Sequence, residues 1–147
     1  MFEPLLEVLP SFRPAWEAFV VEWTPRPGQY WEYEPGEYPN YLLLADLARH
    51  LIDLLEAGRL EDVSAALAVA EAWIVDGEHY VHEAAIVGLL EDLQNVMQRR
   101  SIEEARITDL LGPEGRYWWD RLNGFWSNRE PLGLVDHRRP GTAPKWP

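Results

Sequence analysis

Two histidines and a glutamate lie within five consecutive residues of this 147-residue chain and could contribute to a metal site. His79, His82 and Glu83 stand at positions i, i+3 and i+4, which lie close together on one side of an α-helix. Imidazole and carboxylate groups are common ligands of zinc and of other transition metals. His50 or Asp46 from a neighbouring helix could complete the ligand set. One hypothesis is therefore a metal-dependent enzyme of unknown reaction.

The same residues also fit a purely structural role. HYVHE is not the HExxH pattern of metalloproteases, because its two histidines are three residues apart rather than four. On a helical projection with about 100° per residue, His82 falls in the middle of an apolar arc that includes Ala85 and Leu89. A buried histidine normally bonds to a carboxylate or carbonyl group. We prefer this interpretation, so the sequence predicts no bound metal and no other cofactor.

Other catalytic patterns are missing from the sequence. The chain has neither a P-loop nor a G-x-G-x-x-G segment, and none of its serines lies in a G-x-S-x-G sequence. Adjacent acidic pairs such as Glu91-Asp92 and Glu103-Glu104 diverge by about 100° on a helix, which favours solvated faces over acid–base pairs. The sequence therefore predicts a protein that is not an enzyme.

The stretch TPRPGQYWEYEPGEYP, residues 24–39, combines aromatic and acidic side chains in a segment that cannot form a regular helix. It contains four prolines and two glycines. A loop of this length is uncommon in a compact domain and is often functional. Its rings either fold back to cap the core or form a binding surface, and both interpretations stay open. The candidate partner-binding residues are Tyr30, Trp31, Glu32, Tyr33, Glu34, Glu37 and Tyr38.

The acidic residues are unevenly distributed along the chain, whose formal net charge is −12. Residues 1–98 carry 18 acidic and 4 basic side chains, whereas residues 99–147 carry 7 acidic and 9 basic ones. Such a surface repels nucleic acid and anionic membranes, and it attracts a basic protein. The alternative is that the charge only keeps the domain soluble. The sequence predicts a basic protein partner, and it indicates no particular oligomeric state.

Hydrophobic spacing predicts that the chain is helical over most of its length. The expected helices cover residues 12–23, 41–57, 60–76, 78–98, 102–111 and the segment that begins at Pro113. Alanine occurs on several faces of helix 60–76, so we expect this helix to be the most enclosed, with Ala68 and Ala72 intolerant of larger side chains. Gly58 and Gly77 suit the left-handed position that ends a helix. Ser101 to Glu104 has capping-box spacing.

These elements predict an all-α fold, a compact bundle of about six helices. The short connections favour HEAT-like antiparallel pairs, 41–57 with 60–76 and 78–98 with 102–111. Residues 1–128 are expected to form one helical domain, and the proline-rich residues 129–147 an extended or disordered tail. The absence of cysteine excludes disulfides. No apolar run is long enough for a transmembrane helix and the N-terminus does not read as a secretory signal, so a cytoplasmic protein is expected.

The run YLLLADLARHLIDLLEAGRLEDVSAALAVAEAWIVDGEHYVHEAAIVGLLEDLQN resembles a family of small, all-helical bacterial proteins of unknown function. The resemblance covers about residues 1–98, and DGEHYVHEAAIVGLLEDLQN is its most specific segment. Some members of that family are grouped with immunity proteins of polymorphic toxins. The resemblance therefore implies an acidic protein that binds and blocks a toxin domain, with no catalytic motif to transfer.

Three hypotheses follow from the sequence. The first is a binding protein, namely an immunity protein that neutralises a cognate basic toxin. The second is the metal-dependent enzyme that uses His79, His82 and Glu83, and the third is a structural adaptor domain. Metal content of the purified protein separates the second from the others. A toxin-like reading frame directly upstream separates the first from the third.

Overall fold

A computed structural model describes residues 1–34 and 37–128, and the regular elements within these ranges are all helical. The predicted all-α bundle is confirmed. The proposed tail, residues 129–147, lies outside the described residues. The elements in chain order are α1 (Glu3–Val8), η1 (Pro10–Phe12), α2 (Arg13–Glu22), α3 (Asn40–Glu56), α4 (Leu60–Asp76), α5 (His79–Glu83), η2 (Ala84–Leu90), α6 (Glu91–Arg99), α7 (Ala105–Thr108) and α8 (Pro113–Asn128). No helix in the described ranges is long and apolar enough to cross a membrane.

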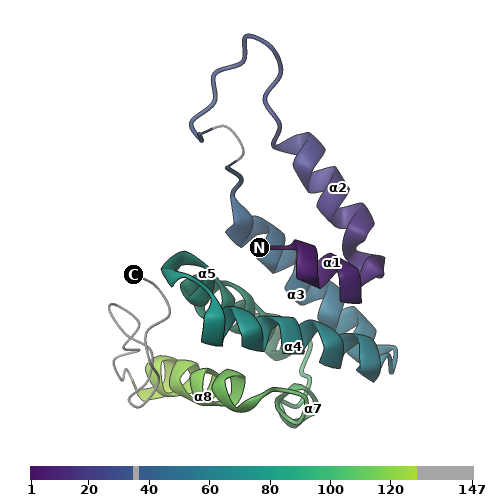
Figure 1. The fold of residues 1–147 in the computed structure, drawn as a ribbon. Helices are drawn as coiled ribbons and strands as arrows, with labels where there is room; N and C mark the ends of the chain where they lie inside the picture. Colours follow the sequence, from purple (N-terminus) through teal and green to yellow (C-terminus); the bar gives the residue numbers. More distant parts are fainter. Residues whose placement is uncertain (35–36, 129–147) are drawn as a thin grey trace.

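Helices α3 and α4 form the predicted hairpin, and α4 lies between α1 and α8 (Figure 1). The turn is closed at Gly58, whose φ of 78° is left-handed. The N–H of Gly58 bonds to the carbonyl of Leu55 at 3.1 Å, and that of Arg59 bonds to the carbonyl of Leu54 at 2.9 Å. This pair of bonds is the Schellman arrangement that ends many helices. The predicted helix end at Gly58 is therefore confirmed.

The most enclosed element is the continuous rod formed by α5, η2 and α6. Its middle part, η2, is a π-helix, and Ala84, Ala85 and Ile86 in it are completely buried. It packs against α3, α4 and α8. The expectation that helix 60–76 would be the most enclosed is wrong, because Ala68 and Ala72 are exposed. Alanine favours a helix wherever it stands, so it marks a helix without marking a buried face.

Two glycines allow the rod to lie close to its neighbours. A Cβ atom on Gly88 would lie 2.9 Å from Leu44 Cδ1 and 3.3 Å from Tyr41 Cδ1, so α3 crosses η2 at this point. Gly77 is not left-handed as expected, because its φ is −64° and its ψ is 151°. A Cβ atom there would lie only 2.4 Å from the Trp73 carbonyl oxygen. Close approach, rather than backbone handedness, accounts for this glycine.

The second predicted helix pair is only partly present. Segment 102–111 contains just the four-residue helix α7, and the expected capping box at Ser101 does not form. Ser101 instead adopts a left-handed φ of 55° and ends α6. The Ser101 N–H bonds to the carbonyl of Gln98 at 3.2 Å, and the Ile102 N–H bonds to the carbonyl of Met97 at 2.9 Å. The same Schellman pattern that glycine forms after α3 is thus made here by serine.

A carboxylate from α4 caps the last helix. The N–H groups of Glu114 and Gly115, at the start of α8, donate to the two oxygens of Glu71 at 3.0 and 2.7 Å. The backbone N–H groups at a helix N-terminus have no partner within the helix, and an anion there is favourable. Glu71 therefore joins α4 to α8, the helix that carries the buried Trp118 and Trp119.

Replacing Glu71 with glutamine is expected to lower the free energy of unfolding by about 1–2 kcal/mol. The amide keeps the shape of the side chain, but it turns an N–H group toward a backbone donor and removes the charge. Urea denaturation measures the difference. Glu17→Gln, at an exposed position of α2, is the matched control. Equal stability of both variants would show that Glu71 does not hold α8.

Candidate functional site

The three residues of the proposed metal site do not converge. His82 is completely buried, and its Nδ1 lies 2.7 Å from the Ile74 carbonyl oxygen. His79 Nε2 and Glu83 Oε2 form a surface pair 3.3 Å apart. Within the described residues, no group of three histidine, cysteine, aspartate or glutamate side chains is close enough to hold a metal ion. The predicted burial of His82 and its bond to a carbonyl group are confirmed.

The additional ligands considered for that site are also engaged elsewhere. His50 Nε2 lies 2.8 Å from the Ser11 hydroxyl, and burial lowers the pKa of this imidazole, with Asp53 and Asp62 opposing the shift. Asp46 pairs with Arg49 on the same helix. Each of the candidate ligands therefore has a local structural role.

Helix α2 and the loop that follows it project from the bundle, as Figure 1 shows. We call residues 13–34 and 37–39 the aromatic arm. Trp23, at the end of α2, contacts Trp31 and Tyr33 of the loop, with ring centroids 5.9 and 6.1 Å apart. Trp31 and Tyr33 also contact each other, at 5.8 Å. The rings thus form a cluster that holds the returning half of the loop against α2 although the loop has no regular structure.

The cluster continues from the loop toward the core. Phe19 is buried on α2 and lies 6.4 Å from Trp23 and 6.0 Å from Tyr38, measured between ring centroids. The interpretation in which the loop rings cap the core therefore holds for Tyr38, which packs against it. Trp31 and Tyr33 fold back only as far as Trp23, and all three rings remain partly buried. Tyr30 differs, because 87% of its surface is exposed.

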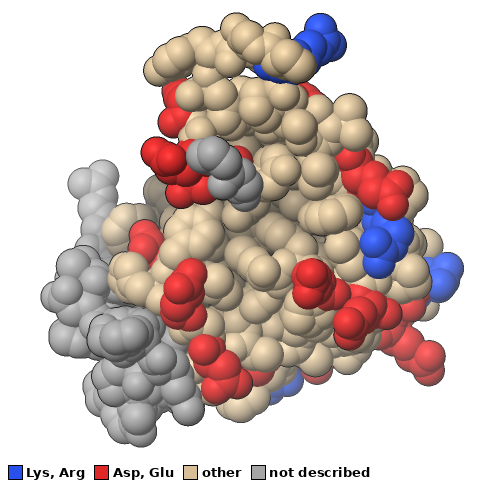
Figure 2. All heavy atoms as spheres, turned by 45° about the horizontal axis from the view of Figure 1, so that its top comes forward, with Lys and Arg blue, Asp and Glu red and all other residues tan. Residues whose placement is uncertain are grey.

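The candidate residues therefore divide into three groups. One ring stands in solvent, three rings are fixed by contacts with α2 and partly exposed, and the carboxylates of Glu32, Glu34 and Glu37 are exposed. Glu37 is also bonded within the loop, since the N–H of Glu34 donates to its Oε2 at 3.1 Å. Figure 2 shows acidic side chains spread over this face of the molecule, with the basic ones near its edges.

A hollow of about 660 Å³ lies where the aromatic arm meets the bundle. We call it the tyrosine hollow. Its lining residues are Tyr33, Glu37, Tyr38, Pro39, Asn40, Tyr41, Glu78 and Tyr80. Sequence reasoning missed Tyr41, Glu78 and Tyr80, which come from the starts of α3 and α5. In the sequence, both tyrosines are recognisable as large aromatic residues in the first turn of a helix. Residue spacing alone does not indicate that the two rings are neighbours.

The phenols of Tyr41 and Tyr80 in the tyrosine hollow remain protonated at neutral pH. Burial raises the pKa of Tyr41 to about 12, and the nearby Glu83 carboxylate adds to the effect. Burial also raises the pKa of Tyr80, although a hydrogen bond with Asn40 opposes the shift. The charge at the hollow therefore comes from its carboxylates, while its walls are neutral aromatic rings.

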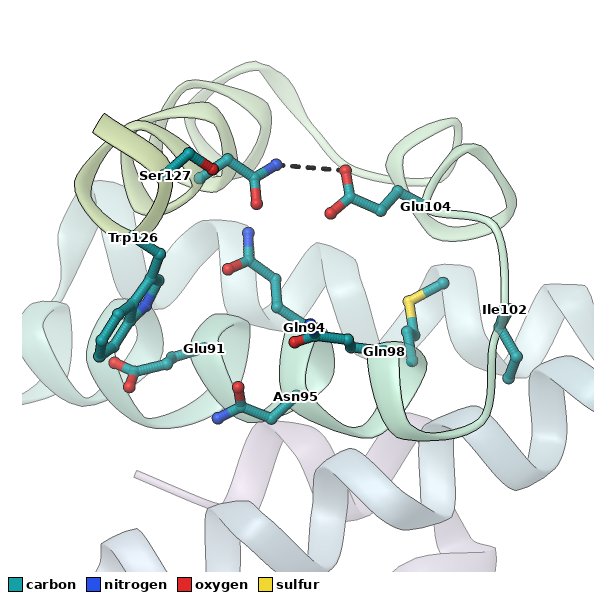
Figure 3. Close-up of a pocket in the computed structure, with 10 residues that line it drawn as sticks. Glu91, Gln94, Asn95, Gln98, Ile102, Glu104, Trp126 and Ser127 are labelled. Carbon is teal, nitrogen blue, oxygen red and sulfur yellow. Dashed lines mark hydrogen bonds between the residues drawn. The ribbon is translucent and has the colours of Figure 1, made fainter. Parts of the chain in front are cut away.

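A second hollow of about 640 Å³ lies between α6 and α8 and is lined mainly by polar side chains (Figure 3). Part of this polar lining is bonded within the protein. Gln94 Nε2 donates to the Trp119 carbonyl at 3.1 Å, and Asn123 Nδ2 donates to Glu104 Oε2 at 3.2 Å, the bond drawn dashed in Figure 3. These side chains bridge α6 and α8 and the connection between them. We therefore assign this hollow a structural role.

The fold and its surface describe a small, acidic, all-α domain with a projecting aromatic arm. The chain belongs to the family defined by a domain of unknown function (DUF7674), whose model matches residues 2–127. The match includes the aromatic arm and α8, so it extends well past residue 98, where the resemblance seen in the sequence ends. No curated protein and no solved structure matches the chain.

Proposed function

We propose that this protein binds another protein through the aromatic arm, and that it acts as an immunity protein that neutralises a basic toxin domain. The observation that carries the proposal is the composition and placement of the arm. It projects from the bundle and carries Tyr30 in solvent beside the partly exposed Trp31 and Tyr33. Tyrosine and tryptophan dominate the energetics of protein interfaces.

The ring contacts in the arm support a role in binding. Trp31 and Tyr33 are held against Trp23 before any partner arrives. A side chain that is already ordered loses little conformational entropy on binding, so more of its contact energy appears as affinity. The cluster keeps these rings on the surface in a fixed arrangement, and Tyr30 beside them remains free to enter a pocket of the partner.

The carboxylates of the arm support a basic partner. The aromatic arm contains five glutamates against two arginines, Arg13 and Arg26. Exposed charges of one sign speed the encounter with an oppositely charged protein, and salt screens this effect. The same charge disfavours nucleic acid and anionic membrane surfaces as partners.

Replacing Glu32, Glu34 and Glu37 together with glutamine is expected to slow association about tenfold at low ionic strength. Association of the variant is also expected to depend less on salt, because the steering charges are gone. Stopped-flow or surface plasmon resonance measurements at several salt concentrations give both results. The triple variant Glu3→Gln, Glu7→Gln and Glu103→Gln, at exposed positions outside the arm, is the control. Equal slowing in both triples would assign steering to net charge rather than to the arm.

The proposal is tested by co-expressing the chain with a toxin-like reading frame found directly upstream of its gene. We expect growth to be restored and the two proteins to purify as a stable complex. Continued toxicity with no complex, while the chain itself is expressed and folded, would contradict the immunity role. A complex that forms without relieving toxicity would support binding alone and leave the adaptor hypothesis in its place.

A further inference from the structure

The tyrosine hollow combines aromatic walls with carboxylates at its rim. Two walls, Tyr33 and Tyr38, belong to the arm, where Tyr33 contacts Trp23 and Tyr38 contacts Phe19. The other two come from the bundle, where Tyr41 and Tyr80 meet edge to face with ring centroids 6.1 Å apart and planes at 75°. The described residues that line the hollow include Glu37 and Glu78 but no lysine or arginine.

The bundle side of the hollow is fixed by close packing. Gly88 of the π-helix leaves room for the Tyr41 ring, since a Cβ atom there would lie 3.3 Å from Tyr41 Cδ1. Asn40 bonds to Tyr80 from the start of α3. Tyr41 and Tyr80 nevertheless keep 37% and 43% of their surfaces exposed, so both rings are available to a ligand. π-Helical segments are rare and frequently occur near functional sites.

The chemistry of the hollow selects a cation with a flat, extended charge. The face of an aromatic ring attracts a cation, and arginine makes this contact more often than lysine does. A guanidinium group also stacks on rings and donates to carboxylates in its own plane. Edge-to-face rings with carboxylates at the rim supply both kinds of contact at once. Glu37 and Glu78 would repel an anionic ligand, and a purely apolar ligand would gain nothing from them.

We propose that the tyrosine hollow is the receptor for an arginine side chain of the bound protein, an assignment that rests on the proposed function. The arm would then contribute exposed rings on its outer side and an arginine site at its base. Binding at the hollow would also tie the arm to the bundle, because each of the two parts contributes two of the four tyrosine walls.

The assignment is tested on the full chain by NMR of its tyrosine rings, with Nα-acetyl-L-arginine amide as the probe. We expect saturable shifts of the Tyr41 and Tyr80 resonances with a dissociation constant in the millimolar range. Nα-acetyl-L-citrulline amide has nearly the same shape without the charge, and it is expected to bind at least about fivefold more weakly. Equal binding of the two probes, or no saturable shift with arginine, would overturn the proposal.

Two variants locate the binding. Glu78→Gln is expected to weaken the arginine probe about threefold or more, whereas Glu103→Gln, an exposed glutamate between α6 and α7, should leave its affinity unchanged. Tyr80→Leu should weaken the probe at least about fivefold while circular dichroism shows an intact fold. Equal effects of the two glutamate variants, or shifts of other tyrosine rings without shifts of Tyr41 and Tyr80, would place the cation elsewhere and contradict the assignment.

The outcome does not depend on the identity of the protein partner. A positive titration shows the arginine site even if the upstream protein neither binds nor is neutralised. Conversely, a stable toxin complex whose affinity is unchanged in Tyr80→Leu and Glu78→Gln would keep the proposed function and remove the hollow from it.

Discussion

Replacement of Trp31 with alanine is expected to raise the dissociation constant of the partner complex at least ~30-fold, which corresponds to about 2 kcal/mol. The ring is held against Trp23 and Tyr33 and remains partly exposed, so it can enter a pocket without first being ordered. Loss of such an anchor acts mainly on the dissociation rate. Surface plasmon resonance with the purified partner measures both rates.

A matched tryptophan on the bundle provides the control for this prediction. Trp126 of α8 is 60% exposed and lies outside the aromatic arm, so Trp126→Ala is expected to leave the affinity unchanged. A thermal melt of each variant is also needed, since Trp31 contacts two other rings. If Trp31→Ala lowered the melting temperature but left the affinity intact, its ring would serve only to cap the fold.

Replacement of Ala85 with leucine is expected to lower the free energy of unfolding by about 3 kcal/mol, through overpacking. Ala85 is completely buried in the π-helix, which packs against α3, α4 and α8. The added side chain has no free space, so neighbouring helices must move or adopt strained rotamers. Ala68→Leu on α4 introduces the same change at an exposed position and is expected to alter stability by less than about 0.5 kcal/mol.

Urea denaturation of the two alanine variants tests where the bundle is most tightly packed. A large effect at Ala68 with a small one at Ala85 would restore the view in which α4 is the central helix. Equal effects would indicate that the rod formed by α5, η2 and α6 is no more constrained than its neighbours.

Residue spacing was sufficient to predict the helical class and the burial of His82. Apolar residues at helical intervals define α3, α4 and the α5–η2–α6 rod without reference to distant contacts. His82 stood in the centre of an apolar arc, and a buried imidazole requires a hydrogen-bond partner, which the Ile74 carbonyl supplies. Both features follow from local periodicity and from the need to satisfy buried polar groups.

Spacing could not decide which small residues are buried. Alanine is compatible with a core position and with an exposed one, so the alanines of α4 gave no reliable indication of its surroundings. Gly77 was assigned to a left-handed turn, whereas it is required because the Trp73 carbonyl approaches it closely. At the end of α6, the left-handed position that glycine usually occupies after a helix is taken by Ser101.

The candidate site was only half visible in the sequence. The rings and carboxylates of residues 30–38 are consecutive, so composition alone identified them. Tyr80 is more than forty residues away, and its position beside Tyr41 depends on how α5 packs next to α3. Trp23, at the end of α2, holds Trp31 and Tyr33 in place through ring contacts. Such tertiary neighbours cannot be read from helical periodicity.

The central claim, that the aromatic arm binds the partner, is tested most directly by the affinity of Tyr30→Ala. Because 87% of the Tyr30 surface is exposed, its removal is expected to shift the melting temperature by less than about 1 °C. Any change in affinity must then come from a lost contact with the partner. We predict that the dissociation constant rises at least about tenfold. A dissociation constant equal to that of the unmodified protein would contradict the assignment of the arm as the binding surface.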